Sequence, residues 1–184
     1  GEDIIKKFEA ETGIKVRYDL FDNNEILHAK LVAGKTGYDI VVPSSNWAKL
    51  QIDGGLLRKL DKAQIPNLKN LDPAIQAQLA KLDPGNQFQV NWLWGFTTVG
   101  INVDKVKAAL GSTPMPDNVW DLVFKPEYIS KMKGCGVSFL DSATEVVPAA
   151  LHYLGKPSFS KNPSDYTGAT NLLKSVRPYV TLFS

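Results

Sequence analysis

The chain has 184 residues, of which 43% are hydrophobic and 22% are charged, and its formal net charge is +2. This composition is typical of a globular protein that buries a core, and no apolar run approaches the ~18 residues that a membrane-spanning helix needs. A net charge so close to zero argues against a nucleic-acid groove, so we expect no nucleic acid among the partners.

Apolar residues alternate between helical and strand spacing from one end of the chain to the other. Helical spacing, with polar caps and glycine stops, predicts helices over residues 4–12, 24–33, 47–52, 73–82, 103–110, 119–124, 127–132, 142–154 and 168–176. Alternating or β-branched runs predict strands over residues 14–20, 38–42, 88–93, 96–102, 137–140 and 179–183. This order of elements predicts an α/β fold with a mostly parallel sheet.

The turn at Lys133-Gly134 is one of two candidate boundaries, together with the loop at residues 113–116. About 50 residues follow the Lys133-Gly134 turn, which is too few for a stable independent domain. Both ends of the chain look cut, since it begins without Met and stops where a strand begins. We therefore expect a piece of a larger fold.

Catalytic chemistry finds no support in the sequence. The patterns G-x-S-x-G, H-E-x-x-H and G-x-G-x-x-G and the Walker loop are absent. The single Cys135 excludes a disulfide within the chain and a cysteine-rich metal site. His28 is expected in solvent on a charged helix face and His152 partly buried, so we expect no catalytic residue, no metal site and no cofactor.

Two places carry polar groups directly after a predicted strand, where ligands bind in open α/β sheets. Ser44, Asn46 and Trp47 follow the strand 38–42, and a role in capping the next helix is an equally good interpretation. Asp141, expected to cap a helix, follows the strand 137–140, and Glu145 lies one helical turn further on, where it could face a cation.

Seven motifs resemble those of a known family, in the same order along the chain. They are Gly13–Val16, Phe21–Glu25, Gly37–Ser44, Leu71–Pro73, Asn102–Val106, Trp120–Leu122 and Cys135–Asp141. They are similar to motifs of the periplasmic polyamine-binding proteins, and most similar to the putrescine-binding branch. The resemblance implies a type II periplasmic binding protein fold, with two α/β lobes that close on the ligand. Residues 1–133 would form the first lobe without its first strand, and residues 134–184 the crossover strand and the beginning of the second lobe.

The resemblance also implies a ligand site. Ser44 matches a residue that lines the ligand channel, Asn46 and Trp47 match neighbouring wall positions, and Glu145 matches the acid that holds one ammonium group. Ser142 stands at a position where the resemblance gives spermidine-preferring relatives an Asp, so we expect the chain to prefer the shorter diamine as its ligand.

Further expectations follow from the same resemblance. The chain would be the solute-binding component of a polyamine importer in the periplasm, with putrescine or a related polyamine as ligand and the membrane permease of an ABC transporter as partner. By itself it would bind weakly, and Cys135 would pair with a cysteine further along the family's chain. The absent first strand would leave a gap between residues 14–20 and 38–42, through which the chain could dimerise. The alternatives are a binder of another small solute and a polyamine-sensing interaction module.

Overall fold

The structure is a computed structural model that describes residues 2–184, so Gly1, the first residue of the predicted first lobe, lies outside it. The described residues fall into two compact units, which we call unit 1, ending at Trp94, and unit 2, Gly95–Ser184. We describe each unit by itself.

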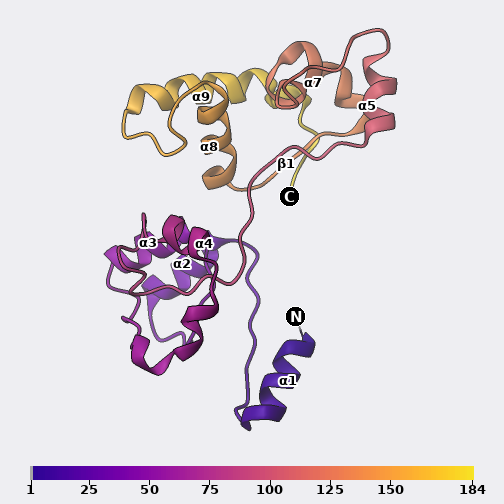
Figure 1. Ribbon diagram of the computed structural model, residues 1–184. Helices are drawn as coiled ribbons and strands as arrows, with labels where there is room; N and C mark the ends of the chain where they lie inside the picture. Colours follow the sequence, from indigo (N-terminus) through magenta and orange to yellow (C-terminus); the bar gives the residue numbers. More distant parts are fainter. Residues whose placement is uncertain (1) are drawn as a thin grey trace. The chain divides into compact units, whose positions relative to one another are not determined.

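Unit 1 consists of helices joined by extended segments (Figure 1). Its helical elements are α1 (Glu2–Thr12), α2 (Asn24–Ala33), α3 (Ser45–Asp53), η1 (Lys62–Gln64), η2 (Pro66–Asn70) and α4 (Pro73–Leu79). Local chemistry sets their ends. The Asn23 side chain accepts a hydrogen bond from the backbone N–H of Ile26 at the start of α2, and Asp72 caps α4 in the same way, with Pro73 as its first residue.

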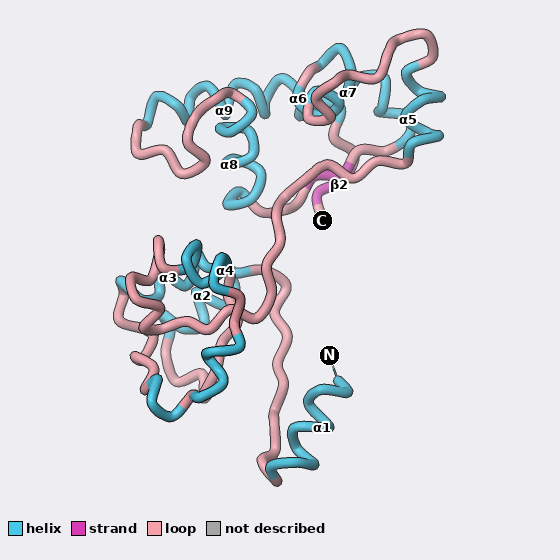
Figure 2. The backbone as a smooth tube through the Cα atoms, in the orientation of Figure 1, coloured by secondary structure: helices cyan, strands magenta, loops and turns pink. Residues whose placement is uncertain are grey.

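The strands predicted over residues 14–20, 38–42 and 88–93 do not form, and these segments are loops (Figure 2). A strand is stable only when a neighbour pairs with its backbone, and none of the three pairs with another segment in the part of unit 1 that the structure describes. Their apolar side chains lie in solvent, Leu20 and Ile40 being 78% and 83% exposed.

Unit 2 contains helices and a sheet of two strands. Its elements are α5 (Val103–Leu110), α6 (Asp121–Phe124), α7 (Pro126–Met132), η3 (Lys133–Cys135), β1 (Ser138–Phe139), α8 (Ala143–Tyr153), α9 (Pro163–Val176), η4 (Arg177–Tyr179) and β2 (Leu182–Phe183). β1 and β2 are parallel, with Ser138 opposite Leu182. The predictions of strands within 137–140 and 179–183 and of a parallel pair are therefore confirmed, whereas the strand predicted over 96–102 does not form.

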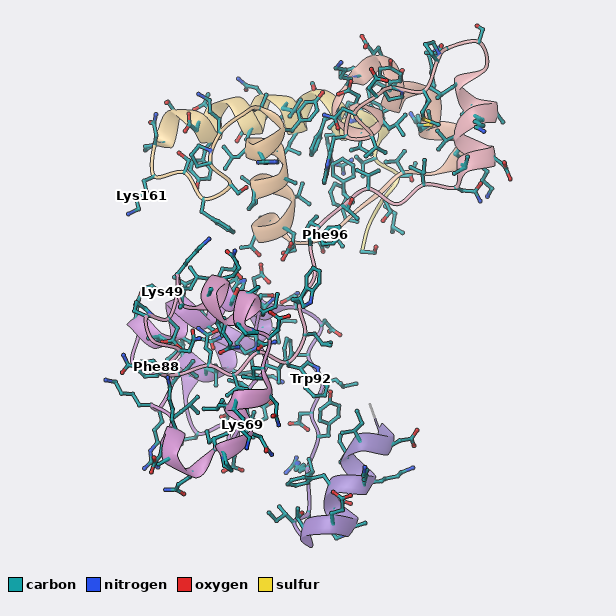
Figure 3. The ribbon with its side chains drawn as sticks, viewed as in Figure 1. Lys49, Lys69, Phe88, Trp92, Phe96 and Lys161 are labelled. Atoms are coloured by element: carbon teal, nitrogen blue, oxygen red, sulfur yellow. The ribbon has the colours of Figure 1, made fainter. Side chains whose placement is uncertain are left out.

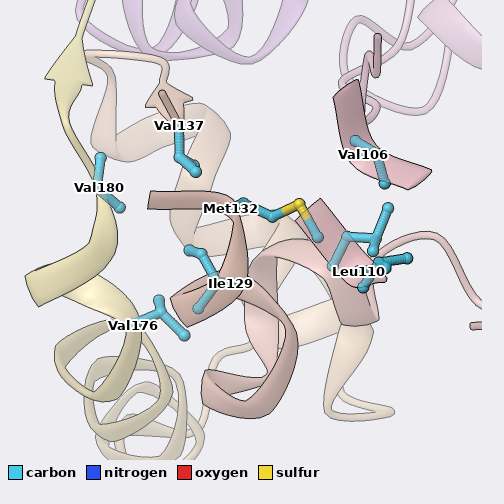
Figure 4. Packing of buried hydrophobic residues seen from close by; sticks show 8 residues of the cluster. Val106, Leu110, Ile129, Met132, Val137, Val176 and Val180 are labelled. Atoms are coloured by element: carbon cyan, nitrogen blue, oxygen red, sulfur yellow. The ribbon is translucent and has the colours of Figure 1, made fainter. Parts of the chain in front are cut away.

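The main core of unit 2 surrounds α7. Ile129 is completely buried, with Met132 on the same helix and Val176 from α9 in the same cluster (Figure 4). A second cluster joins Phe124 to Leu151 of α8. Because residues on both sides of the 133/134 turn share the first cluster, the two parts of the chain fold together in unit 2, and the assignment of 1–133 and 134–184 to two lobes stays a prediction.

Removing buried volume at the centre of this cluster should destabilise unit 2. We expect Ile129→Ala to lower the free energy of unfolding by about 2–5 kcal/mol, because the cavity that it leaves cannot collapse between α7 and α9. Urea unfolding followed by circular dichroism measures the change. Ile101→Ala, at a residue that is 37% exposed, is the matched control and should cost at most about 1 kcal/mol. Equal costs for the two variants would contradict the core described here.

Candidate functional site

The first group of site residues lies at the start of α3 in unit 1. Ser44 precedes the helix and makes two hydrogen bonds with Asn24 of α2: its backbone N–H donates to Asn24 Oδ1 at 2.9 Å, and its hydroxyl accepts from Asn24 Nδ2 at 3.0 Å. The Ser44 side chain makes no cap hydrogen bond, although its position is the N-cap. The two bonds therefore fix the beginning of α3 against the beginning of α2.

Trp47 lies one turn further along α3 and contacts α2 as well. Its ring centroid is 5.3 Å from that of His28, with an angle of 54° between the rings. The expectation that His28 is solvated is wrong, because the residue is half-buried and its Nδ1 atom is buried without a hydrogen-bond partner among the described residues. Asn46 and Trp47 are both half-buried, so each keeps part of its surface accessible.

The second group lies where β1 leads into α8. Asp141 follows β1 and donates its backbone N–H to the carbonyl of Ser184, which extends the pairing with β2. Ser142, not Asp141, occupies the N-cap position of α8, and the Ser142 and Thr144 hydroxyls are 3.0 Å apart. The prediction that Asp141 caps the helix is therefore wrong, because the strand pairing holds its backbone one residue before the cap.

Glu145 lies in the first turn of α8 and is half-buried. Its Oε2 atom accepts a hydrogen bond from the Thr97 hydroxyl, from the segment that precedes α5. A carboxylate in this turn is also stabilised by the positive end of the helix dipole. Thr97 thus orients one oxygen of Glu145, and the other oxygen accepts no hydrogen bond within the described residues.

A hydrogen-bonded network holds α8 in place behind Glu145. The Tyr153 hydroxyl, on α8, donates to Asp121 Oδ1 of α6 at 2.6 Å, and the Lys125 ammonium lies 2.7 Å from Asp121 Oδ2. The Lys125 bond and then the Tyr153 bond hold the pKa of the Asp121 carboxyl below its usual value. Burial and the bond to Asp121 raise the pKa of Tyr153 to about 12.

The structure places the predicted site residues in two groups. Ser44, Asn46 and Trp47 lie together at the start of α3 in unit 1, and Ser142 and Glu145 lie together at the start of α8 in unit 2. Within residues 2–184, no group of three His, Cys, Asp or Glu residues is arranged to hold a metal ion. What each group offers is a half-buried surface with polar hydrogen-bonding atoms, and unit 2 adds one carboxylate.

Three contributors escaped the sequence analysis. Asn24 had a detectable signal, because Asn23 and Asn24 are adjacent polar residues where a helix begins, and the structure uses Asn23 for the cap and Asn24 for Ser44. His28 and Thr97 had none, since their partners Trp47 and Glu145 are distant in the sequence.

Aromatic side chains of the strands predicted over 88–93 and 96–102 are more exposed than a core position allows. Trp92 and Phe96, at the end of unit 1 and the beginning of unit 2, are 62% and 77% exposed, and their side chains project from the chain in Figure 3.

Comparison with known proteins identifies the family. A model of the family described as bacterial extracellular solute-binding protein matches residues 3–184. The chain belongs to this family. It is 53% identical over 181 residues to the putrescine-binding periplasmic protein SpuD of Pseudomonas aeruginosa and 50% identical over 182 residues to the putrescine-binding periplasmic protein PotF of Escherichia coli. Each match covers 98% of this chain and 49% of the relative, so the chain spans about half the length of these curated relatives.

Solved structures support the same assignment. A putative spermidine/putrescine ABC transporter protein from Listeria monocytogenes aligns with a TM-score of 0.79 at 29% identity, over 100% of this chain and 53% of that one. The Tp0655 (TpPotD) lipoprotein of Treponema pallidum gives the same TM-score and identity over 54% of its chain. The predicted fold class, part of an α/β periplasmic binding protein, is therefore confirmed. None of the described helices is long and apolar enough to cross a membrane.

Loss of the Tyr153 hydroxyl should loosen α8. We expect Tyr153→Phe to lower the free energy of unfolding by about 1.5–3 kcal/mol at pH 7, because it removes a hydrogen bond to a charged group. The raised pKa of Tyr153 means that this bond contributes fully below about pH 10 and is lost as the pH rises through about 12. The lowered pKa of Asp121 means that its contribution is present above the usual carboxyl pKa and is lost as the pH falls through the folded value.

Thermal and urea unfolding across this pH range measure the difference between the two proteins. Tyr179→Phe is the matched control, since Tyr179 is half-buried and its hydroxyl has no hydrogen-bond partner in the described chain. A difference for Tyr153→Phe that stays constant from neutral pH to pH 12 would contradict the network.

Proposed function

We propose that this chain is part of the solute-binding component of a polyamine importer of the ABC type, which binds putrescine or a related polyamine in the periplasm. The observation that carries the proposal is Glu145, a half-buried carboxylate held by Thr97 at the start of α8. Two relatives at 50–53% identity are named for binding putrescine, which supports the choice of ligand. Our proposal includes no reaction and no catalytic residue.

The chemistry of a linear diamine suits the residues present. A protonated amine donates several hydrogen bonds, and a bond to a carboxylate is worth roughly 1.5–3 kcal/mol, which Glu145 would supply. The methylene groups pack against aromatic faces, and Trp47 offers one together with a cation–π attraction of roughly 0.5–2 kcal/mol. Ser44, Asn46 and Ser142 would provide polar wall positions, and the short uncharged side chain of Ser142 favours the diamine over spermidine.

The importer role requires a second partner. Several relatives are periplasmic binding proteins, and the similar structure from Listeria monocytogenes is described as an ABC transporter protein. We therefore propose the membrane permease of an ABC transporter as the partner that receives the polyamine.

Nuclear magnetic resonance of the 184-residue chain, titrated with putrescine, tests the ligand. We expect the amide signals of the first turn of α8 to shift with a weak affinity, in the millimolar range, because one carboxylate cannot replace a closed site. Butane-1,4-diol, which has the same length without the charges, should leave them unchanged. Glu145→Gln should abolish the shifts, whereas Asp141→Asn, at an exposed acid outside the helix, should retain them.

Two outcomes would contradict this proposal. Equal shifts with the diol would show that charge does not direct the binding, and unchanged shifts in Glu145→Gln would remove Glu145 from the site. Micromolar affinity of the chain by itself would contradict the expected weakness.

We further propose that the chain dimerises through the extended segments of unit 1. Residues 14–20 and 38–42 present exposed apolar side chains, among them Tyr18, Leu20 and Ile40, and neither segment pairs with a strand within the described residues. Tyr38 donates its hydroxyl to Asp19 at 3.2 Å, which connects the two segments. Such edges pair readily with a second copy.

Sedimentation velocity over a range of concentrations tests the dimer. We expect association that Tyr18→Lys weakens at least tenfold, because a charge on the edge opposes pairing. The control Lys15→Ala changes a residue that is already polar and exposed, and it should leave the association unchanged. A monomer at all concentrations would contradict the proposal.

A further inference from the structure

A pocket of about 340 Å³ lies in unit 1, beside the helical elements η1, η2 and α4 and the loop that follows α4. This volume falls within the ~300–1,000 Å³ of most small-molecule pockets. Two ammonium groups and three side-chain amides line it, and no carboxylate is among the described lining residues, which are Lys62, Leu68, Lys69, Gln76, Asn86 and Gln89. The charge of the lining therefore favours an anion over a diamine.

Hydrogen bonds fix the loop that forms one wall of this pocket. The carboxylate of Asp83, a residue that is 2% exposed, accepts from the backbone N–H groups of Phe88 and Gln89 at 2.8 and 3.1 Å. Asn86 Nδ2 donates to the backbone carbonyl and to Oε1 of Gln76 in α4, at 3.1 and 2.9 Å. These bonds hold Asn86 at a φ of 47°, in the left-handed region that few residues other than glycine adopt. The wall is therefore fixed before any ligand binds.

Two amide atoms of this wall have no partner. Asn86 Oδ1, an acceptor, and Gln89 Nε2, a donor, are buried and make no hydrogen bond within the described residues. A buried polar group without a partner costs free energy, which a ligand recovers when it pairs with that group. The terminal torsion of a glutamine side chain is soft, so a small rotation turns Gln89 Nε2 toward a ligand in the pocket. The amides thus offer one donor and one acceptor.

Both lysines of the pocket have donors left for a ligand. An ammonium group carries three N–H donors. Lys62 donates to the backbone carbonyl of Gly85, and Lys69 is exposed and makes no hydrogen bond within residues 2–184. Neither lysine forms an ion pair with an acid of the described chain. An anion in the pocket would therefore meet two positive charges that no described carboxylate pairs with.

We infer that this pocket is an anion site that binds hydrogen phosphate. The phosphate oxygens would accept charge-assisted hydrogen bonds from Lys62 and Lys69 and a further bond from Gln89 Nε2, with water filling the rest of the pocket. Hydrogen phosphate retains one hydroxyl near neutral pH, and this hydroxyl would donate to Asn86 Oδ1. Sulfate has no such hydroxyl at this pH, so the unpaired acceptor selects against it. The inference is independent of the proposed polyamine, a cation that the two lysines repel.

Nuclear magnetic resonance of the side-chain amide groups tests the site in the 184-residue chain. Titration with sodium phosphate near neutral pH, at constant ionic strength, should shift the NH₂ signals of Asn86 and Gln89 in a saturable way. Constant ionic strength keeps the screening of charges equal in all titrations. Sulfate should bind at least tenfold more weakly than phosphate, and putrescine should leave both signals unchanged.

Two lysine variants separate the pocket from the general charge of the protein. Lys69→Gln should weaken phosphate binding at least tenfold, and it should retain the fold because this side chain has no partner in the described chain. The control Lys30→Gln removes the same charge from an exposed residue of α2 that does not line the pocket, and it should retain the affinity. The absence of a saturable shift with phosphate would overturn the inference, because water alone would then fill the pocket. Equal affinity for sulfate, or unchanged affinity in Lys69→Gln, would also overturn it.

Discussion

The parallel pairing of β1 with β2 is the constraint on which unit 2 depends. It joins Val137 to Thr181, residues that are 44 positions apart, and brings Val137 and Val180 into the core around Ile129. The same pairing extends to Asp141 and thereby fixes where α8 begins. Glu145 follows within one turn, so the position of the only carboxylate proposed to bind ligand is a consequence of strand pairing.

Unit 1 shows what happens when such pairing is missing. Its extended segments expose their apolar side chains, and few of its side chains are buried. Gln51 is completely buried with both side-chain amide atoms unpaired, and an unpaired buried group costs about 1–3 kcal/mol. The contacts between its helices α2 and α3 are both polar and aromatic: Asn24 is hydrogen-bonded to Ser44, and the His28 ring contacts the Trp47 ring. We therefore expect the Ser44 group to be less rigid than the Glu145 group.

The sequence predicted the helices well because their signals are local. Asp72 with Pro73 and Asn23 with Gly34 mark the ends of α4 and α2 through bonds to neighbouring residues. Strands at residues 14–20 or 96–102 were predicted from the same kind of pattern and are absent, because alternating apolar residues indicate a face to be buried but not whether a partner pairs with it. The candidate site residues were predicted from their position after expected strands and from family resemblance, whereas contacts between distant residues, such as Thr97 with Glu145, required the structure.

Amide hydrogen exchange along the isolated chain tests the central claim, that unit 2 is a paired and packed support for Glu145 whereas the strands expected in unit 1 are unpaired. The account predicts slow exchange for the amides of Ile129 in α7 and Leu182 in β2, and exchange close to that of an unfolded peptide for those of Tyr18 and Ile40. Equal protection of the two pairs of amides would contradict it.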